Sequence, residues 1–280
     1  MTASDIRCDE GDDGVLTLTF TRDPKLNAVS PGMLDVLKDA AAELDRRDDL
    51  RVLLITAEGR YFTAGMDIVG RETPPEERPE GPASGSAVRR YHRQLHVFLD
   101  ELEAIEKPII LAAQGPCLGV GVELAVSCDF RFASDAATFL LPELSNLGVL
   151  PGSGGISRLT KLVGPQWSRW LVMAGRSIDA AQALAIGLVH EVHPVDEFAA
   201  RVREFAHSLT ERSGEALGLA KLAIDTAAYV DRTTARHFDR VANTLLLTSD
   251  EHRRMVLDFK ERRANRRVQP APETATREDQ

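Results

Sequence analysis

The feature that most constrains the fold is an alternation of short apolar strands with an amphipathic helix near the start of the chain. Residues 15–20 (VLTLTF) alternate apolar side chains with threonine, which is typical of a half-buried strand. Residues 51–57 (RVLLITA) are almost continuously apolar and predict a second strand. Between them, Ser30 followed by Pro31 predicts a helix start, and one apolar stripe continues to residue 44. Strands that alternate with helices predict an α/β fold.

The remaining segments predict a core followed by helices. Residues 88–106 have a helical pattern, and residues 109–113 (IILAA) predict a buried strand. Residues 217–230, 233–248 and 250–264 predict three helices in series. We therefore expect a core over residues 1–195, a C-terminal helical region over 196–266 and a disordered tail over 267–280. The proline- and glycine-rich residues 70–87 predict a mobile loop within the core.

Composition excludes several classes of protein. The net charge of -9 argues against a nucleic-acid-binding protein, which needs lysine and arginine to neutralise phosphates. The three cysteines have no metal-ligand spacing, so we expect buried thiols in a reducing compartment. The first 13 residues lack a signal-peptide pattern, and the most apolar run, 109–122, is too short to span a bilayer. We expect a cytoplasmic protein that has no membrane partner.

A small-residue turn around Gly65 (61–68) and a glycine-rich turn (115–124) follow two of the predicted strands. Such turns let the backbone approach a ligand with its N–H groups pointing inward, so two turns could form an oxyanion hole. Glu123 stands in an apolar stretch, where an unpaired carboxylate is costly. It is either an acid/base group with a raised pKa or a glutamate that a buried arginine satisfies.

Other motifs fail on inspection. The glycines at 119 and 152 lack the third glycine of a dinucleotide-binding fingerprint, and no Walker-type GK[ST] occurs. Pro151 stands where a GxSxG elbow around Ser153 requires glycine. His92 and His96 have helical spacing but lack the glutamate of a zinc-protease motif, so we expect them on an exposed helix face.

Several stretches together resemble the enoyl-CoA hydratase/isomerase (crotonase) family. They are LNAV (26–29), FTAGMDI (62–68), KPIILAAQGPCLGVGVELAVSCDFRFAS (107–134), LPGSGGISRL (150–159) and LDFKERRAN (257–265). The resemblance implies a crotonase-like spiral of ββα units with a C-terminal helical region. It is less specific for the reaction, because one fold hosts several chemistries.

The resemblance also implies roles for individual residues. The backbone N–H groups of Ala64 and Val120 would polarise a thioester carbonyl. Glu123 would activate the water that adds at Cβ, and Glu143 would exchange a proton with Cα. Two departures stand out: Val120 replaces a glycine, and ELSNLG (143–148) is one residue longer than usual. The extra residue is either absorbed as a bulge or moves Glu143 away, which would leave Ser145 and Asn146 as the nearby polar groups.

Coenzyme A (CoA) binding is implied in the same way, for a substrate rather than a cofactor. The implied positions are Lys25, Ala28, Asp67 and Ile68, with Phe259 and Arg262 on the last helix. No metal or redox cofactor is implied, and relatives form homotrimers or dimers of trimers.

The leading hypothesis is an enoyl-CoA hydratase, a lyase that converts a 2-trans-enoyl-CoA into a 3-hydroxyacyl-CoA. Its support is the presence of both glutamates. The alternatives are an enoyl-CoA isomerase or another specialised acyl-CoA reaction of the family, or an acyl-CoA binder without catalysis. The sequence does not identify the acyl chain.

Overall fold

The computed structural model describes residues 5–68 and 84–268, with the side chains of 264–268 left out. The chain divides into two compact units, Met1–Gly214 and Glu215–Gln280, which are described separately. Within the described residues, no helix is long and apolar enough to cross a membrane. The predicted loop over 70–87 lies mostly outside the described residues. Its last part, Gly85 to Ala87, is helical.

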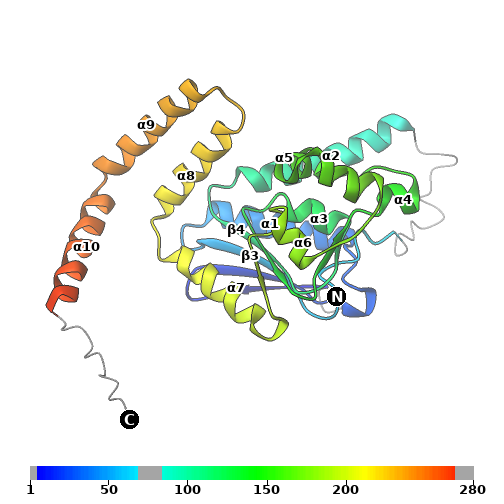
Figure 1. Ribbon diagram of the computed structural model, residues 1–280, viewed down its shortest axis with the longest axis horizontal. Helices are drawn as coiled ribbons and strands as arrows, with labels where there is room; N and C mark the ends of the chain where they lie inside the picture. Colours follow the sequence, from blue (N-terminus) through cyan, green and yellow to red (C-terminus); the bar gives the residue numbers. More distant parts are fainter. Residues whose placement is uncertain (1–4, 69–83, 269–280) are drawn as a thin grey trace, which may run out of the picture. The chain divides into compact units, whose positions relative to one another are not determined.

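A six-stranded sheet forms the centre of the first unit (Figure 1). Its order is β1-β2-β3-β4-β6-β9, and only the β1–β2 pair is antiparallel. The strands are β1 (Ile6–Glu10), β2 (Val15–Phe20), β3 (Val52–Ala57), β4 (Ile109–Ala113), β6 (Phe130–Ser134) and β9 (Glu191–His193). The strands predicted over 15–20, 51–57 and 109–113 are confirmed. The α/β fold class is therefore correct. Residues 15–20 are, however, buried on both faces rather than half-buried, because Thr17 and Thr19 are buried as well.

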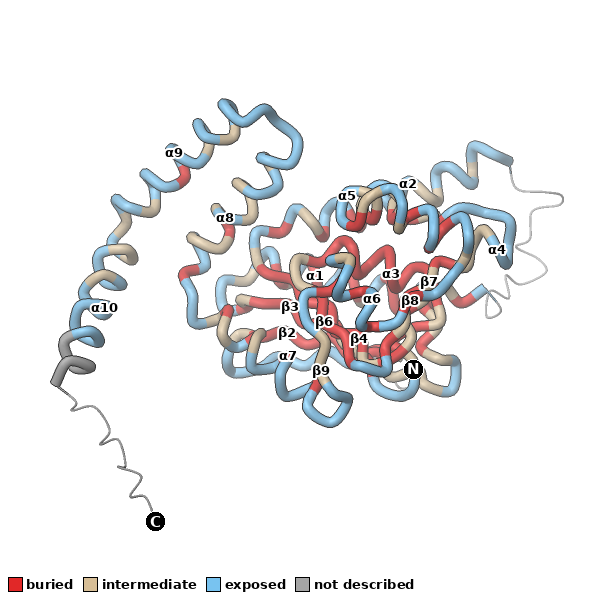
Figure 2. Tube along the Cα trace, in the orientation of Figure 1, coloured by how far each residue is buried: buried red, intermediate tan, exposed pale blue. Residues whose placement is uncertain are grey.

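Both faces of the sheet are buried (Figure 2). In β3, Leu53 and Ile55 point into the larger core, whereas Val52 and Leu54 point into the second core on the other face. Alternate strand residues point to opposite faces, so two-sided burial explains why this strand is continuously apolar. The helices α1 (Pro31–Arg46) and α2 (Gly85–Ala104) contribute to the larger core, and α7 (Val195–Thr210) covers the other face.

Helix α1 begins as the sequence predicts. The Ser30 hydroxyl accepts a hydrogen bond from the Met33 amide at 3.3 Å, and Pro31 occupies the first turn. At the other end, Lys107 Nζ donates to the carbonyl oxygens of Leu44 and Arg47 at 2.7 and 2.6 Å. These bonds satisfy carbonyl groups that a helix end leaves without partners.

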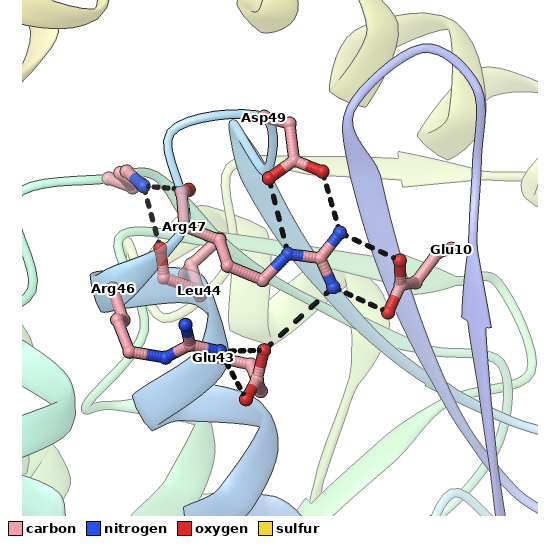
Figure 3. Close-up of polar contacts among 7 residues, drawn as sticks. Glu10, Glu43, Leu44, Arg46, Arg47 and Asp49 are labelled. Atoms are coloured by element: carbon pink, nitrogen blue, oxygen red, sulfur yellow. Dashed lines mark hydrogen bonds and ion pairs between the residues drawn. The ribbon is translucent and has the colours of Figure 1, made fainter.

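An ion-pair cluster surrounds Arg47, just after α1 (Figure 3). Its guanidinium contacts both carboxylate oxygens of Glu10 at 2.8 and 2.9 Å and those of Asp49 at 3.2 and 2.6 Å. Arg46 pairs with Glu43 in the last turn of α1. The cluster ties β1 to the α1–β3 connection on the surface.

A second, three-stranded sheet lies on the side of the unit that carries the glycine turns. It comprises β5 (Cys117–Leu118), β7 (Thr138–Leu140) and β8 (Ile178–Asp179). The adjoining helices are α3 (Val120–Ala125), α4 (Glu143–Leu147), α5 (Gly155–Ser168), the π-helix η3 (Arg169–Met173) and α6 (Ala180–Ala185). Single bridges pair Thr63 with Cys117 and Val29 with Met66. The first bridge brings the 61–68 turn beside the 115–124 turn, and the second brings it beside the segment before α1.

The second unit contains the three helices that the sequence predicts. They are α8 (Gly214–Ala227), α9 (Arg232–Thr248) and α10 (Asp250–Val268). The Asp231 carboxylate caps α9 by accepting from the amides of Thr233 and Thr234. The sequence placed α7 in this region, but α7 belongs to the first unit because Phe198 and Val202 pack into the sheet core. Most of the predicted tail, residues 269–280, lies outside the described residues.

Candidate active site

A cavity of about 640 Å³ opens at the glycine turns of the first unit. Four segments line it: the 61–68 turn, the N-terminal half of α2, the start of α3, and the stretch from Pro142 to Ser153. Both predicted carboxylates, Glu123 and Glu143, are among the lining residues. The structure therefore brings together the sequence segments that carry the predicted chemistry.

The two glycine turns lie against each other in this cavity. Gly65 has a φ of 99° and Gly119 a φ of 56°, in the left-handed region that favours glycine. A Cβ at Gly119 would lie 3.6 Å from the Gly65 Cα and 2.8 Å from Glu143 Oε1. At Gly119 the Glu143 carboxylate leaves no room for a Cβ, and at Gly65 the positive φ is what favours glycine.

The predicted amide donors have different environments. The Val120 amide, directly after Gly119, donates to no acceptor among the residues described. The Ala64 amide instead donates to the Leu26 carbonyl at 2.9 Å. The prediction that Ala64 supplies a free N–H group is therefore wrong, since a peptide N–H used inside the turn is not available to a ligand.

Met66 is the donor that the sequence reasoning missed. It lines the cavity directly after Gly65, and no acceptor in the described part of the chain receives its N–H. The two available amides thus follow the two glycines with positive φ. In the sequence, the residue directly after each of these glycines is the available donor, so the position of Gly65 could have identified Met66. Met66 and Val120 together could stabilise one oxyanion.

The Glu123 carboxylate is held by the backbone. Its side chain is 2% exposed, and Oε1 accepts hydrogen bonds from the amides of Ser153 at 2.8 Å and Gly155 at 3.0 Å. The alternative of a glutamate paired with a buried arginine is therefore wrong. A Cβ at Gly155 would lie 2.4 Å from Glu123 Cγ, so the loop can approach only because this residue is glycine.

The Glu143 carboxyl has a contrasting environment at the start of α4. It is half-buried, and its Oε2 has no hydrogen-bond partner among the described residues. Burial raises the pKa of Glu143 to about 7, and the nearby Glu123 charge adds to the increase. A carboxyl that titrates near neutral pH can exchange protons readily.

The extra residue after Glu143 does not remove this side chain from the cavity. Residues Glu143–Leu147 form the single turn α4, and Gly148 ends it with a φ of 67°. Ser145 bonds to the Pro142 carbonyl, whereas Asn146 lines the cavity together with Glu143. The insertion is absorbed within the helical turn, and Asn146 is an additional polar group at the site.

Comparison with known proteins identifies the family. The model for enoyl-CoA hydratase/isomerase matches residues 10–267. The chain belongs to this family.

Similar proteins agree with that assignment. A probable enoyl-CoA hydratase of Mycobacterium bovis is 34% identical over 78% of this chain and 80% of its own length. The crotonyl-CoA hydratase of Syntrophomonas wolfei is 33% identical over 91% of this chain and 95% of its own. An enoyl-CoA hydratase structure from Geobacillus kaustophilus has a TM-score of 0.82 at 31% identity and covers 92% of this chain and 95% of its own. The fold is that of the crotonase family.

The candidate CoA residues of the first unit differ in exposure, and Ile68 is the one that the cavity lining includes. Lys25 is exposed, Ala28 is half-buried, and Ile68 is 58% exposed on the cavity wall. Asp67 is 8% exposed; its amide donates to Val29 and its carboxylate pairs with Arg22 at 2.7 Å. Asp67 therefore also fixes the turn that presents Met66.

The two remaining candidates, Phe259 and Arg262, belong to α10 in the second unit. Phe259 is 60% exposed, and Arg262 Nε donates to the Asp258 carbonyl of its own helix. Both side chains are at the surface of that unit. Their predicted role in binding the nucleotide end of CoA stays a prediction.

Proposed function

We propose that this protein is an enoyl-CoA hydratase that converts a 2-trans-enoyl-CoA into a 3-hydroxyacyl-CoA. One observation carries the proposal: Glu123, Glu143, Met66 and Val120 line a single cavity, and the amides of Met66 and Val120 have no acceptor among the described residues. The relatives named as hydratases support the same reaction class.

In the proposed mechanism, the substrate's thioester oxygen accepts hydrogen bonds from the amides of Met66 and Val120. The Glu123 carboxylate accepts a hydrogen bond from the attacking water and takes up its proton as oxygen bonds to Cβ. The electron pair of the double bond moves toward the thioester, whose enolate oxygen the two amides stabilise. Glu143, protonated, gives its proton to Cα. Proton transfer between the carboxyls and solvent restores the starting state.

Substrate binding is proposed along the surface described above. Lys25, Ala28, Asp67 and Ile68 would contact CoA, and Phe259 and Arg262 would contact its nucleotide end. CoA is part of the substrate, and the proposed chemistry needs no metal or redox cofactor. The apolar wall formed by Leu147, Val149 and Leu150 supports an acyl chain rather than a charged group at this end of the cavity.

The assembly is proposed to be a homotrimer or a dimer of trimers. The second unit exposes large apolar side chains, which supports a role in an interface. They include Ile224, Tyr229, Val241, Leu245, Leu257 and Phe259. Light scattering in solution tests the state, and a monomer at micromolar concentration would contradict it. The cytoplasmic location stays a prediction that subcellular fractionation tests.

The decisive experiment is hydration of a panel of 2-trans-enoyl-CoA thioesters with short, long and aromatic acyl groups. Loss of the conjugated-thioester absorbance reports turnover, and mass spectrometry identifies the 3-hydroxy product. A parallel assay with 3-enoyl-CoA thioesters measures double-bond isomerisation. Isomerisation without hydration would replace the proposal by an isomerase. Acyl-CoA binding without any turnover would indicate a binder.

A further inference from the structure

Four polar side chains form one stripe on α2 beside the active-site cavity. Spacings of four, four and three residues place them on a single helix face. They are His92, His96, Asp100 and Glu103. The sequence predicted an exposed helix face for the two histidines, and His96 is exposed while His92 is half-buried. The contact of each of them with the loop that holds Glu123 was not predicted.

Both histidines contact the same carbonyl oxygen, that of Gly152. His92 Nδ1 lies 2.8 Å and His96 Nε2 lies 3.0 Å from this oxygen. A carbonyl oxygen only accepts, so each of these nitrogens carries the proton that it donates. A Cβ at Gly152 would lie 2.4 Å from His92 Cε1. The imidazole thus lies directly on the Gly152 backbone.

Arg158 supports the same loop one peptide further along. It pairs with Asp100 and Glu103 of the stripe, and its side chain is 10% exposed. Its Nη1 donates to the carbonyl oxygens of Ser153 and Gly154 at 3.4 and 3.3 Å. The loop therefore receives donors on three successive carbonyl groups.

The opposite side of the same peptides holds the carboxylate of Glu123. The peptide that links Gly152 to Ser153 presents its oxygen to the histidines and its N–H to Glu123 Oε1. The peptide that links Gly154 to Gly155 likewise presents its oxygen to Arg158 and its N–H to Oε1.

A peptide group is planar, so fixing its oxygen fixes the direction of its N–H bond. A donor on the oxygen also polarises the N–H group and strengthens the bond that it gives. We propose that His92 and His96 are positioning residues, which orient the Gly152–Ser153 peptide and through it the Glu123 carboxylate. The inference rests on the proposed hydratase, since it assigns a second layer of support to that site.

Isosteric substitutions test the proposal atom by atom. An asparagine amide matches the position of histidine Nδ1, and a glutamine amide matches that of Nε2. We expect His92→Leu and His96→Leu each to lower kcat about tenfold and the double variant about 100-fold, with KM within about threefold, because the loss affects only the orientation of a catalytic group. His92→Asn and His96→Gln should recover most of the loss. Gln94→Leu, an exposed change on the same helix, is the matched control.

The kinetic pattern separates positioning from substrate contact, because His92 also lines the cavity. A loss confined to KM, or a loss that the isosteres do not recover, would overturn the proposal. So would kcat values within twofold of wild type for the double leucine variant. Coupling to Glu123→Gln gives a second check: the leucine changes should cost little further when the carboxylate is already absent.

Hydrogen exchange of the 150–159 peptide distinguishes failure of this inference from failure of the hydratase. Exchange of the Ser153 amide should accelerate in the double leucine variant, since the Gly152 carbonyl loses both of its donors, whereas the Gly154 carbonyl keeps Arg158. Unchanged exchange would overturn the inference whatever the activity. If the wild-type protein showed no turnover but exchange accelerated in the variant, the proposed function would be overturned. The inference that the histidines hold the loop would still stand.

Discussion

The environments of Glu123 and Glu143 differ although both carboxyls face one cavity. Glu123 is buried, with one oxygen bonded to two backbone amides from the 152–155 loop. Glu143 is half-buried on the single turn α4, with one oxygen that has no partner among the described residues. One carboxyl is therefore held by two backbone amides of a distant loop, and the other has an oxygen without such support.

This difference suits two roles in the proposed reaction. A group that aims a water molecule at Cβ needs a fixed direction, which backbone donors supply. A group that exchanges a proton with Cα needs a pKa near the working pH, and burial raises the pKa of Glu143 to about 7. The asymmetry gives a structural reason to assign the water to Glu123 and the Cα proton to Glu143.

The largest expected effect comes from Glu123→Gln. Glutamine keeps an oxygen that can accept from Ser153 and Gly155, so the loop should remain in place while the base is lost. We expect kcat to fall about 10,000-fold, at the upper end for general acid–base catalysis, because solvent cannot replace a buried group. Hydration kinetics measure the loss, with the exposed Glu101→Gln as a control. A variant that retained a tenth of the wild-type activity would contradict the role of Glu123 as the base.

A smaller loss is expected for Glu143→Gln, about 1,000-fold in kcat, because solvent can reach this half-buried position and supply a proton slowly. Hydration requires the protonated acid, so the wild-type rate should fall as pH rises through about 7. The Glu143→Gln variant should not show this fall in rate as pH rises. A profile that is the same in both proteins would assign the titration to another group.

Val120→Pro should remove one oxyanion donor and little else. Val120 is the first residue of α3, where proline is tolerated, and Gly119 has no Cβ to clash with the ring. Loss of the N–H group should lower kcat about 100-fold, or about 3 kcal/mol of transition-state stabilisation. Val120→Ala keeps the N–H group and serves as the matched control. Equal losses in both variants would indicate a packing effect instead.

Much of this site could be predicted from the sequence because its signals are local. Strand periodicity indicated β2 and β3, and Ser30-Pro31 indicated the start of α1. Glu123 stands in a stretch that resembles the family and Glu143 in the segment that departs from its spacing, and the structure brings both to the cavity. Each of these predictions depends on residues close together in the chain.

The errors concern contacts between distant segments. Ala64 loses its free N–H group to the Leu26 carbonyl, 38 residues earlier in the chain. The α2 histidines lie on a partly exposed face, as predicted, but the sequence did not show that Gly152, 60 residues from His92, contacts them. Helical spacing reveals that residues share a face, but it does not reveal what packs on that face.

The smallest expected effect is on the free energy of unfolding, and it follows from the same difference between Glu123 and Glu143. The pKa of Glu143 is raised from 4.5 to about 7 in the folded protein, so the native state binds more protons than the unfolded state between these values. Stability should therefore fall as pH rises through this window, and the loss is complete above about 7.

Glu143→Gln cannot ionise and should gain stability over wild type across the same window. We expect a gain of about 1 kcal/mol at high pH, after discounting for solvent exposure of the carboxyl. Urea denaturation of both proteins at pH 4.5 and pH 8.5 measures it. If the variant's advantage did not grow with pH, the pKa of Glu143 would not be raised in the folded protein, and the contrast with Glu123 would rest on hydrogen bonding alone.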